Sequence, residues 1–242
     1  MCTVTFIPSR EKIFLTSNRD EKLSRPDAVA PACHRYGETM LLCPADAKSG
    51  GTWIALKENG DAAVLLNGAF VKHDMEKPYG RSRGLILLDI FTHQRPAWFY
   101  CRFDLAGIEP FTLILFENSC LYELRWDGEK KHMKQLNSGR SYIWSSSTLY
   151  NEETARKREN WFAAFLNRHP VPTRQDILRF HTHAGDGEEA NALFMRREPD
   201  YRTVSTTAIL LCEGRGSMLY HDHKQDQVAE KKIELTGIIQ AA

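Results

Sequence analysis

The sequence lacks an excess of charge of either sign, and it lacks any apolar run long enough to span a membrane. Its 32 basic and 31 acidic residues leave a formal net charge of +1, so we expect no nucleic-acid partner drawn in by an overall field. The longest strongly apolar run, Leu85–Leu88, ends at Asp89, far short of the ~20 residues of a membrane helix. No basic segment followed by an apolar stretch opens the chain, so a secretory signal peptide is not indicated. These absences predict a cytoplasmic protein with no integral membrane segment.

Closely spaced cysteines and flexible linkers are also absent. The six cysteines are scattered over 242 residues without a CxxC pair, which indicates neither a disulfide framework nor a zinc site. No repeat, low-complexity tract or linker rich in Pro, Gly or Ser divides the chain. The content of 42% hydrophobic and 26% charged residues is that of a globular protein. We therefore predict a single domain over residues 1–242, and the sequence leaves the oligomeric state unknown.

Two pairs of histidines are the best candidates for metal ligands. They are His181-x-His183 and His221-x-His223, and on a strand such a pair points both rings to one side, which suits zinc or copper. Both pairs follow the ends of predicted elements, where solvated histidines are common. We therefore interpret them as structural or surface residues and predict no metal and no cofactor, with a metal enzyme as an alternative.

Strand and helix patterns alternate in blocks along the chain. Period-two patterns and turn signals predict strands, and three-to-four-residue periodicity with capping residues predicts helices. The predicted strands lie near residues 2–7, 12–17, 39–43, 52–56, 62–66, 111–117, 120–126, 132–136, 142–145, 206–212, 217–221 and 232–237. The predicted helices lie near residues 83–93, 152–168, capped by Asn151, and 174–181, capped by Thr173. Strands, then helices, then strands indicate an α+β fold with mostly antiparallel sheets.

Cys2 stands where a single residue can supply both a nucleophile and a base. Removal of Met1 would leave a thiol and a free α-amine on Cys2. The amine has a pKa of about 7.7–8.0 and the thiol one of about 8.5, so the amine can accept the thiol proton near neutral pH. The other interpretation is a strand residue that alternates with Val4 and Phe6 on one face.

The first predicted hairpin brings a polar run to this cysteine. With residues 8–11 as the loop, paired residues have numbers that sum to about 19, and Arg19 lies diagonally beside Cys2. A slip by one residue puts Asn18 opposite Cys2 and Asp20 on its face instead. An arginine there favours the thiolate and can bind a carboxylate or an oxyanion, whereas a carboxylate would hold the ammonium form of the amine. A charged turn after a strand is the alternative interpretation.

Several short motifs follow one another in the first 90 residues. They are Met1-Cys2-Thr3, Asn18–Glu21, Arg25-Pro26, Gly50–Trp53, Asn67 and Ser82–Gly84. In these motifs the chain resembles the NRDE family, also called the transport and Golgi organisation protein 2 family, whose name comes from the tetrapeptide at residues 18–21. The resemblance implies an N-terminal-nucleophile hydrolase-like fold, a four-layer αββα sandwich with mostly antiparallel sheets. It also implies kinship with cysteine amidases that cleave bile-acid conjugates and penicillin V.

The resemblance further implies a set of site residues. Matched by position, the catalytic residues are Cys2 as nucleophile, Arg19 and Asp20 as its partners, and Asn67 as a donor to the oxyanion. The expected substrate-binding residues are Asn18, Arg83 and Arg202.

The C-terminal half departs from the family pattern. Residues 145–148 contain no asparagine, where the family usually carries a Ser-Asn pair. Arg202 stands two residues before Val204, which aligns with an arginine of the family, and on a strand it would point to the same face. Eukaryotic members of the family are linked to haem movement and lipid metabolism. Two functions therefore stay open for a small-molecule substrate or ligand. One is a cysteine amidohydrolase for a small amide or acyl substrate, and the other is a non-catalytic carrier of haem or an acyl lipid on the same fold.

Overall fold

The computed structural model describes residues 3–73, 79–212 and 214–236. Its helices there are α1 (Arg83–Phe91), α2 (Pro96–Arg102), α3 (Glu152–Arg168) and α4 (Arg174–His183). Sheet A contains β1 (Thr3–Ser9), β2 (Lys12–Lys22), β10 (Tyr142–Ser145), β11 (Arg196–Arg197), β12 (Tyr201–Cys212), β13 (Arg215–Asp222) and β14 (Gln227–Glu234). Sheet B contains β3 (Val29–Tyr36), β4 (Thr39–Ala45), β5 (Ile54–Lys57), β6 (Ala62–Asn67), β7 (Phe111–Glu117), β8 (Cys120–Trp126) and β9 (Lys131–Leu136).

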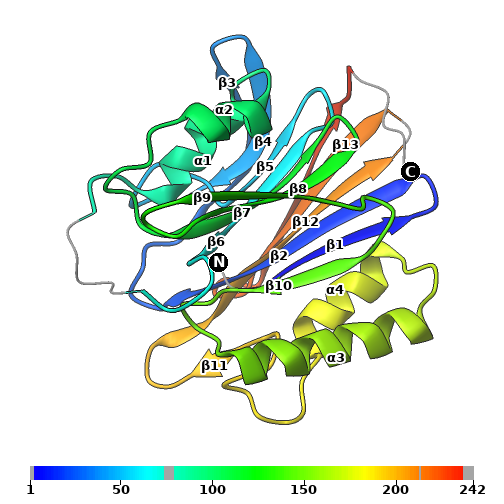
Figure 1. Cartoon of the computed structure of the whole chain (residues 1–242). Coiled ribbons are helices and arrows are strands. Elements are labelled where there is room, and N and C mark those ends of the chain that lie inside the picture. The colour runs from blue at the N-terminus through cyan, green and yellow to red at the C-terminus, as the bar shows by residue number, and fades with distance from the viewer. Residues whose placement is uncertain (1–2, 74–78, 213, 237–242) are drawn as a thin grey trace.

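The two sheets pack face to face between two layers of helices (Figure 1). Sheet A runs β10-β1-β2-β12-β13-β14, with β11 beside β12, and sheet B runs from β3 to β9 in chain order. Neighbouring strands are antiparallel throughout both sheets. Helices α1 and α2 cover sheet B, and α3 and α4 cover sheet A. The predicted α+β class and αββα sandwich are confirmed.

The alternation of side chains along β1 and β2 explains the layers. Val4 and Leu15 point into the core between the sheets, whereas Ile7 and Phe14, which pair with each other across the hairpin, pack against the helices. Successive residues of a strand face opposite sides, so a strand that is apolar on both faces must be covered on both. Helix α3, which begins after Asn151, buries its apolar residues Phe162 and Phe165 against this outer face of the sheet.

The helix caps on the sheet A side form as the sequence predicts. The Asn151 side chain accepts a hydrogen bond from the Thr154 amide, and Thr173 and Asp176 form a reciprocal capping box. These bonds satisfy amide groups that the first turn of a helix leaves without partners.

The register of the first hairpin differs from both predicted registers. The loop contains only Arg10 and Glu11, and Thr3 pairs with Asn18, so the numbers of paired residues sum to 21 rather than about 19. Pro8 remains in β1 because β10 pairs only with residues 3–6, and no ladder bond is lost at the proline. A shift of two residues preserves the side-chain face, so Arg19 keeps its predicted side of the sheet.

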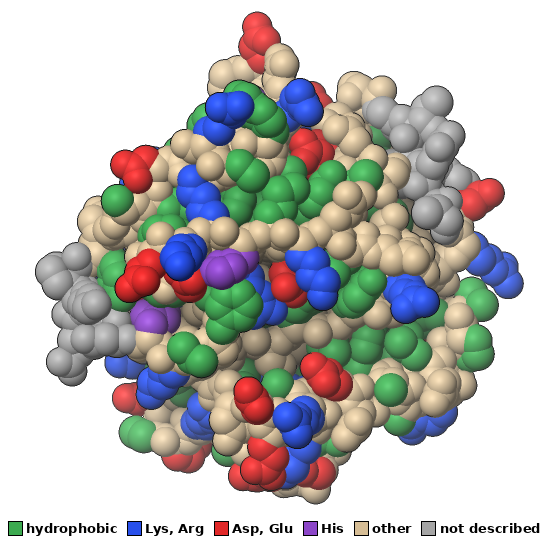
Figure 2. All heavy atoms as spheres, viewed as in Figure 1, with side chains coloured by type: hydrophobic (Ala, Val, Ile, Leu, Met, Phe, Trp, Pro, Cys, Tyr) green, Lys and Arg blue, Asp and Glu red, His purple; other side chains and the backbone are tan. Residues whose placement is uncertain are grey.

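Three elements were not predicted from the sequence, namely β3, α2 and β11. The last strand is Gln227–Glu234 instead of 232–237, and residues 237 onward lie outside the described part. No helix within the described residues is both long enough and apolar enough to cross a membrane. On the face that Figure 2 shows, acidic and basic side chains are interspersed, as expected from the balanced composition.

Candidate functional site

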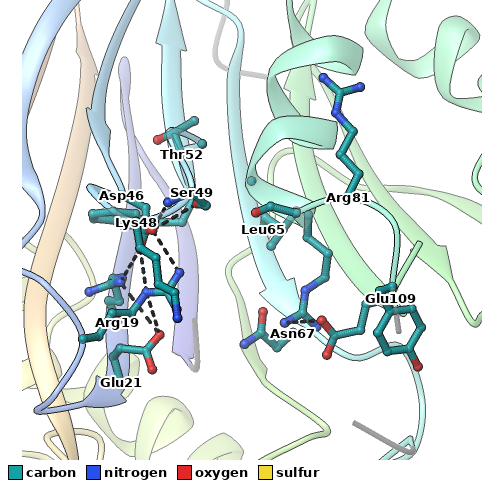
Figure 3. Close-up of a pocket in the computed structure, with 17 residues that line it drawn as sticks. Arg19, Glu21, Asp46, Lys48, Ser49, Thr52, Leu65, Asn67, Arg81 and Glu109 are labelled. Carbon is teal, nitrogen blue, oxygen red and sulfur yellow. Dashed lines mark hydrogen bonds and ion pairs between the residues drawn. The ribbon is translucent and has the colours of Figure 1, made fainter. Parts of the chain in front are cut away.

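An open pocket of about 430 Å³ lies where β2, β6 and the start of α1 come together. Its lining includes Arg19 of β2, Asn67 of β6 and Arg83 of α1. In Figure 3, Arg19 and its neighbours stand on one side of the pocket, and Asn67 and Glu109 stand on the other. The structure therefore brings together three of the residues predicted for the site, from both sheets.

Arg19 is held by a cluster of charged side chains centred on Asp46. Its Nη2 lies 2.7 Å from Asp46 Oδ2, and its guanidinium carbon lies 4.9 Å above the Trp53 ring. Arg25 donates to both oxygens of the same carboxylate, at 2.8 and 2.9 Å. Glu21 completes the cluster at 3.8 Å from Arg19 and 3.5 Å from Arg25. Because Asp46 follows β4 and Arg19 is on β2, the cluster joins the two sheets at the edge of the pocket.

Asp46 is ionised in this cluster. Burial by itself would raise the pKa of the Asp46 carboxyl, but hydrogen bonds from Arg25 and from the Ser49 amide outweigh it and hold the pKa well below its usual range. The Ser49 amide and hydroxyl donate to Oδ1 at 2.9 and 3.0 Å. The carboxylate thus fixes the loop before β5 and orients Arg19 at the same time.

Across the pocket, Arg83 is oriented by Glu109. Arg83 Nη2 lies 3.1 Å from Glu109 Oε2, and its Nη1 donates to the Pro110 carbonyl at 3.1 Å. His73 Nε2 lies 2.9 Å from the other oxygen of Glu109. Arg83 therefore presents a positioned cation at the rim of the pocket.

Asn67 is anchored through its backbone. The Ser146 hydroxyl donates to the Asn67 carbonyl at 2.7 Å and contacts the Thr148 hydroxyl at 2.8 Å. Within the described residues no hydrogen bond to the Asn67 side-chain amide is found, so this amide is available to a ligand in the pocket. The stretch 145–148, where the family asparagine is absent, here supports the end of β6.

Two glycines allow the helix and the strand entry to meet beside this pocket. A Cβ at Gly51 would lie 2.5 Å from the Gly84 carbonyl carbon, and a Cβ at Gly84 would lie 2.8 Å from the Thr52 oxygen. Distances this short are steric clashes, so only glycine allows the backbones to approach this closely. The Gly50–Trp53 and Ser82–Gly84 motifs therefore form a single close backbone contact with each other.

Asn18 lies on the other face of β2, away from the pocket. Its Nδ2 donates to the carbonyls of His181 and Leu193 at 2.9 and 2.8 Å. Its Oδ1 accepts from Thr206 Oγ1 at 2.9 Å and from His181 Nδ1 at 3.1 Å. The fully buried amide thus links β2 to the segments that follow α3.

Asp20 also points to the helix-covered side of sheet A. The Tyr150 and Thr203 hydroxyls donate to its two oxygens at 2.7 and 2.5 Å, and the residue is 3% exposed. Arg19 and Asp20 are therefore adjacent in the chain but face opposite sides of the sheet.

Arg202 lines a different cavity, of about 450 Å³, on the helix side of sheet A. The bulge in β12 between Thr203 and Ser205 changes the alternation there, so spacing from Val204 does not give the direction of Arg202. Cys2 lies outside the described residues, and the description of β1 begins at Thr3, opposite Asn18.

His181, the first residue of one histidine pair, occupies a structural position. His181 is fully buried, and burial, aided by the charge of Arg158, lowers its pKa to about 3. Because the Asn18 oxygen can only accept, His181 donates from Nδ1 and accepts the Thr5 hydroxyl at Nε2, 2.8 Å away. Among the described residues, no group of three or more His, Cys, Asp or Glu side chains is placed to hold a metal ion.

Sequence reasoning missed Asp46 and Glu109 as residues of the site. The motif Asp46-x-x-Ser49 could have indicated the first, because aspartate commonly accepts from an amide three residues on. Glu109 carries no comparable signal, since its partners Arg83 and His73 are distant in sequence.

The sandwich of two antiparallel sheets between helix layers is the N-terminal-nucleophile hydrolase-like fold. The chain belongs to the Transport and Golgi organisation 2 family, whose model matches residues 1–227. This confirms the family resemblance of the N-terminal motifs and extends it through most of the chain. No curated protein sequence matches the chain.

Solved structures with a similar fold include those of a bile acid hydrolase and of an acid amidase. Two variants of the conjugated bile acid hydrolase from Clostridium perfringens match with TM-scores of 0.56 and 0.53 at 10% and 13% identity. These matches cover 99% and 97% of this chain and 98% and 92% of theirs. The Caenorhabditis elegans ortholog of N-acylethanolamine-hydrolyzing acid amidase matches with a TM-score of 0.51 at 12% identity, over 86% of this chain and 92% of that one. At such identities the likeness establishes the fold.

Proposed function

We propose that this protein is a cysteine amidohydrolase of the N-terminal-nucleophile type, acting on a small amide or acyl substrate in the cytoplasm. The observation that carries the proposal is the pocket in which Arg19 and Asn67 face each other beside the start of β1. The first described residue of β1, Thr3, pairs with Asn18, the chain neighbour of Arg19.

The proposed reaction proceeds through a thioester. The α-amine of Cys2 accepts the thiol proton, and the thiolate attacks the substrate carbonyl carbon to form a tetrahedral oxyanion. Collapse of the oxyanion breaks the C–N bond, and the leaving amine takes the proton. Water then attacks the thioester, which releases the acid and restores the thiol.

Each remaining residue has a defined part in this scheme. Asn67 donates its free amide to the oxyanion, and Arg19, fixed by Asp46, favours the thiolate. Asp20, held from the helix side, orients the N-terminal segment, and Arg83 binds an acidic group of the substrate. We leave Asn18 out of the substrate contacts because both of its polar atoms have partners on the opposite face.

The lining of the pocket favours a small polar substrate over haem or an acyl chain. Charged and hydroxyl side chains dominate it, and the larger side chains with apolar surface are Trp53, Leu65 and Tyr79. An extended apolar ligand would leave these charges desolvated without partners, which is costly. The carrier function with a role in haem trafficking therefore has less support from this site.

Two measurements test the proposed function. The intact mass of the purified protein shows whether Met1 is removed, which the mechanism requires. A panel of conjugated bile acids, N-acylethanolamines and short-chain amides then identifies a cleaved substrate. We expect Cys2→Ala to lower kcat by at least about 10³-fold, whereas the exposed Cys33 tolerates Cys33→Ala. Retained Met1 together with full turnover by Cys2→Ala would exclude the mechanism.

The oxyanion role of Asn67 has a separate test. Asn67→Ala should lower kcat by about 10²–10³-fold with little change in KM, because the donor acts mainly in the transition state. The exposed Asn167 of α3 provides the matched control, Asn167→Ala. An unchanged kcat in Asn67→Ala would assign the oxyanion to other donors.

A further inference from the structure

A second cavity lies on the side of sheet A opposite the candidate active site. It has a volume of about 450 Å³ and is enclosed by the end of α4, the segment that leads to β11, and β12. A neighbouring hollow of about 660 Å³ shares Thr182, His183, Phe194 and His223 with it. Together they form one recess with polar groups at the β12 end and Leu178 and Leu219 in the neighbouring hollow.

Arg202 has no partner in this recess. Its Nε is fully buried and makes no hydrogen bond, and no ion pair to Arg202 is found within the described ranges. The other buried or half-buried arginines of those ranges each have a carboxylate, carbonyl or hydroxyl acceptor. A buried donor without an acceptor has lost its hydration with no hydrogen bond to replace it, so Arg202 differs from the other arginines and requires an explanation.

The charges that line the cavity leave Arg202 uncompensated. Arg196 lies 3.9 Å from Glu189, so the charges of these two side chains neutralise each other. The lining thus has one more cation than anions, at Arg202. The cavity therefore has the polarity of an anion site.

His223 is neutral and closes one side of the cavity. Burial, together with the nearby charge of His221, lowers its pKa to about 4, and Arg202 acts on it in the same direction. The hydrogen of the Thr206 hydroxyl is given to Asn18, so His223 donates from Nε2 to this hydroxyl, 2.8 Å away. The ring is thus fixed, and its Nδ1 is left as an acceptor.

We propose that this cavity is a binding site for a small oxyanion, a phosphate or a carboxylate, in which the unpartnered Arg202 guanidinium provides the principal contact. A guanidinium presents parallel N–H donors that match two oxygens of either group. A ligand with one acidic OH would also donate to His223 Nδ1. The site does not depend on the proposed hydrolase activity, because sheet A separates it from Arg19 and Asn67.

The site is nevertheless connected to the NRDE segment. Thr203 lines the cavity and donates to Asp20 at 2.5 Å. The Met195 amide donates to the same hydroxyl at 2.9 Å. A ligand against Thr203 would therefore contact the residue that holds Asp20 in place.

Calorimetric titration of the whole protein with inorganic phosphate and with succinate tests the site, at an ionic strength held constant with sodium chloride. We expect saturable binding of at least one anion, and the two titrations distinguish phosphate from carboxylate recognition. Arg202→Gln should weaken binding by at least about tenfold. The matched control is Arg215→Gln, which removes an exposed arginine from the neighbouring strand β13 and should change the affinity less than about twofold.

A second readout avoids dependence on the folding of Arg202→Gln. In the wild-type protein, the bound anion should shift one arginine Nε–H resonance that is missing from the spectrum of Arg202→Lys. Absence of saturable binding of both anions would overturn the proposal. So would equal affinity of wild type and Arg202→Gln, or a shift reproduced by chloride alone.

Discussion

At the scale of single residues, Asn18 shows that a motif residue can serve the fold rather than the pocket. Asn18→Ala removes four buried hydrogen bonds, two of them to backbone carbonyls. We expect the free energy of unfolding to fall by about 2–4 kcal/mol, measured by urea denaturation, while Asn167→Ala on the exposed face of α3 changes it little. Normal stability with a raised KM would instead make Asn18 a substrate contact.

His181, the partner of Asn18, makes the stability dependent on pH. Its pKa is about 3 in the folded protein against 6.5 for the free side chain, so the unfolded chain binds the proton first as the pH falls. Its contribution is complete above about pH 6.5 and is lost between pH 6.5 and 3, at up to about 1.4 kcal/mol per pH unit. His223, with a pKa of about 4, adds to the same trend.

The measurement is urea unfolding at pH 7, 6 and 5 for wild type and His181→Gln. Carboxylates contribute to the slope in both proteins, so the difference between the two isolates His181. The variant should be less stable at pH 7 and should lose less stability toward pH 5. Identical slopes for wild type and His181→Gln would contradict a neutral buried ring.

At the scale of elements, the contact between α1 and the entry to β5 shapes the candidate active site. Gly84→Ala places a methyl group 2.8 Å from the Thr52 oxygen. Although alanine favours a helix over glycine by about 1 kcal/mol, we expect a net loss of about 1–3 kcal/mol because backbone must move. Gly80→Ala, with open space around it, is the matched control. Unchanged thermal unfolding of Gly84→Ala would show that the helix can shift freely.

The sequence predicts elements well where local signals such as helix caps agree. It predicts them poorly where the pairing of strands distant in sequence determines the structure. The capped helices α3 and α4 follow from Asn151 and Thr173, because capping is local. The hairpin register does not follow from a local signal. Arg10 adopts a positive φ of 55°, and no glycine or asparagine stands there to indicate such a turn. Strand β3 alternates exposed and half-buried residues and forms only because β4 lies beside it.

The candidate site was predictable only in part for the same reason. Arg19, Asn67 and Arg83 line one pocket as the family motifs imply, although they come from three different elements. Asp46 gains its importance only when the fold brings Arg19 and Arg25 to the same carboxylate. The bulge beside Thr203 sends Arg202 to another cavity, because an extra residue in a strand breaks the period of two on which the sequence prediction relied.

At the scale of the whole molecule, the core between the sheets predicts that the chain unfolds as one unit. Residues of both sheets, such as Ile209 and Leu56, are fully buried in this shared core. Loss of either sheet would expose the inner face of the other, and no separate core would remain to stabilise it. A single domain, as predicted from the sequence, therefore requires one cooperative transition.

Two substitutions, one between each sheet and its helix layer, test whether the chain unfolds in one cooperative transition. Leu113→Ala makes a cavity between sheet B and its helices, and Phe162→Ala makes one between sheet A and its helices, each at a cost of about 2–5 kcal/mol. In a single unit, both lower the same urea midpoint, and far-ultraviolet circular dichroism and tryptophan fluorescence give coincident curves. Val228→Ala, at an exposed position, should leave the midpoint unchanged. If each variant shifted only one of two separate transitions, the sheets would be independent domains, and a pocket shared between them would not be rigid enough to preorganise Arg19 opposite Asn67.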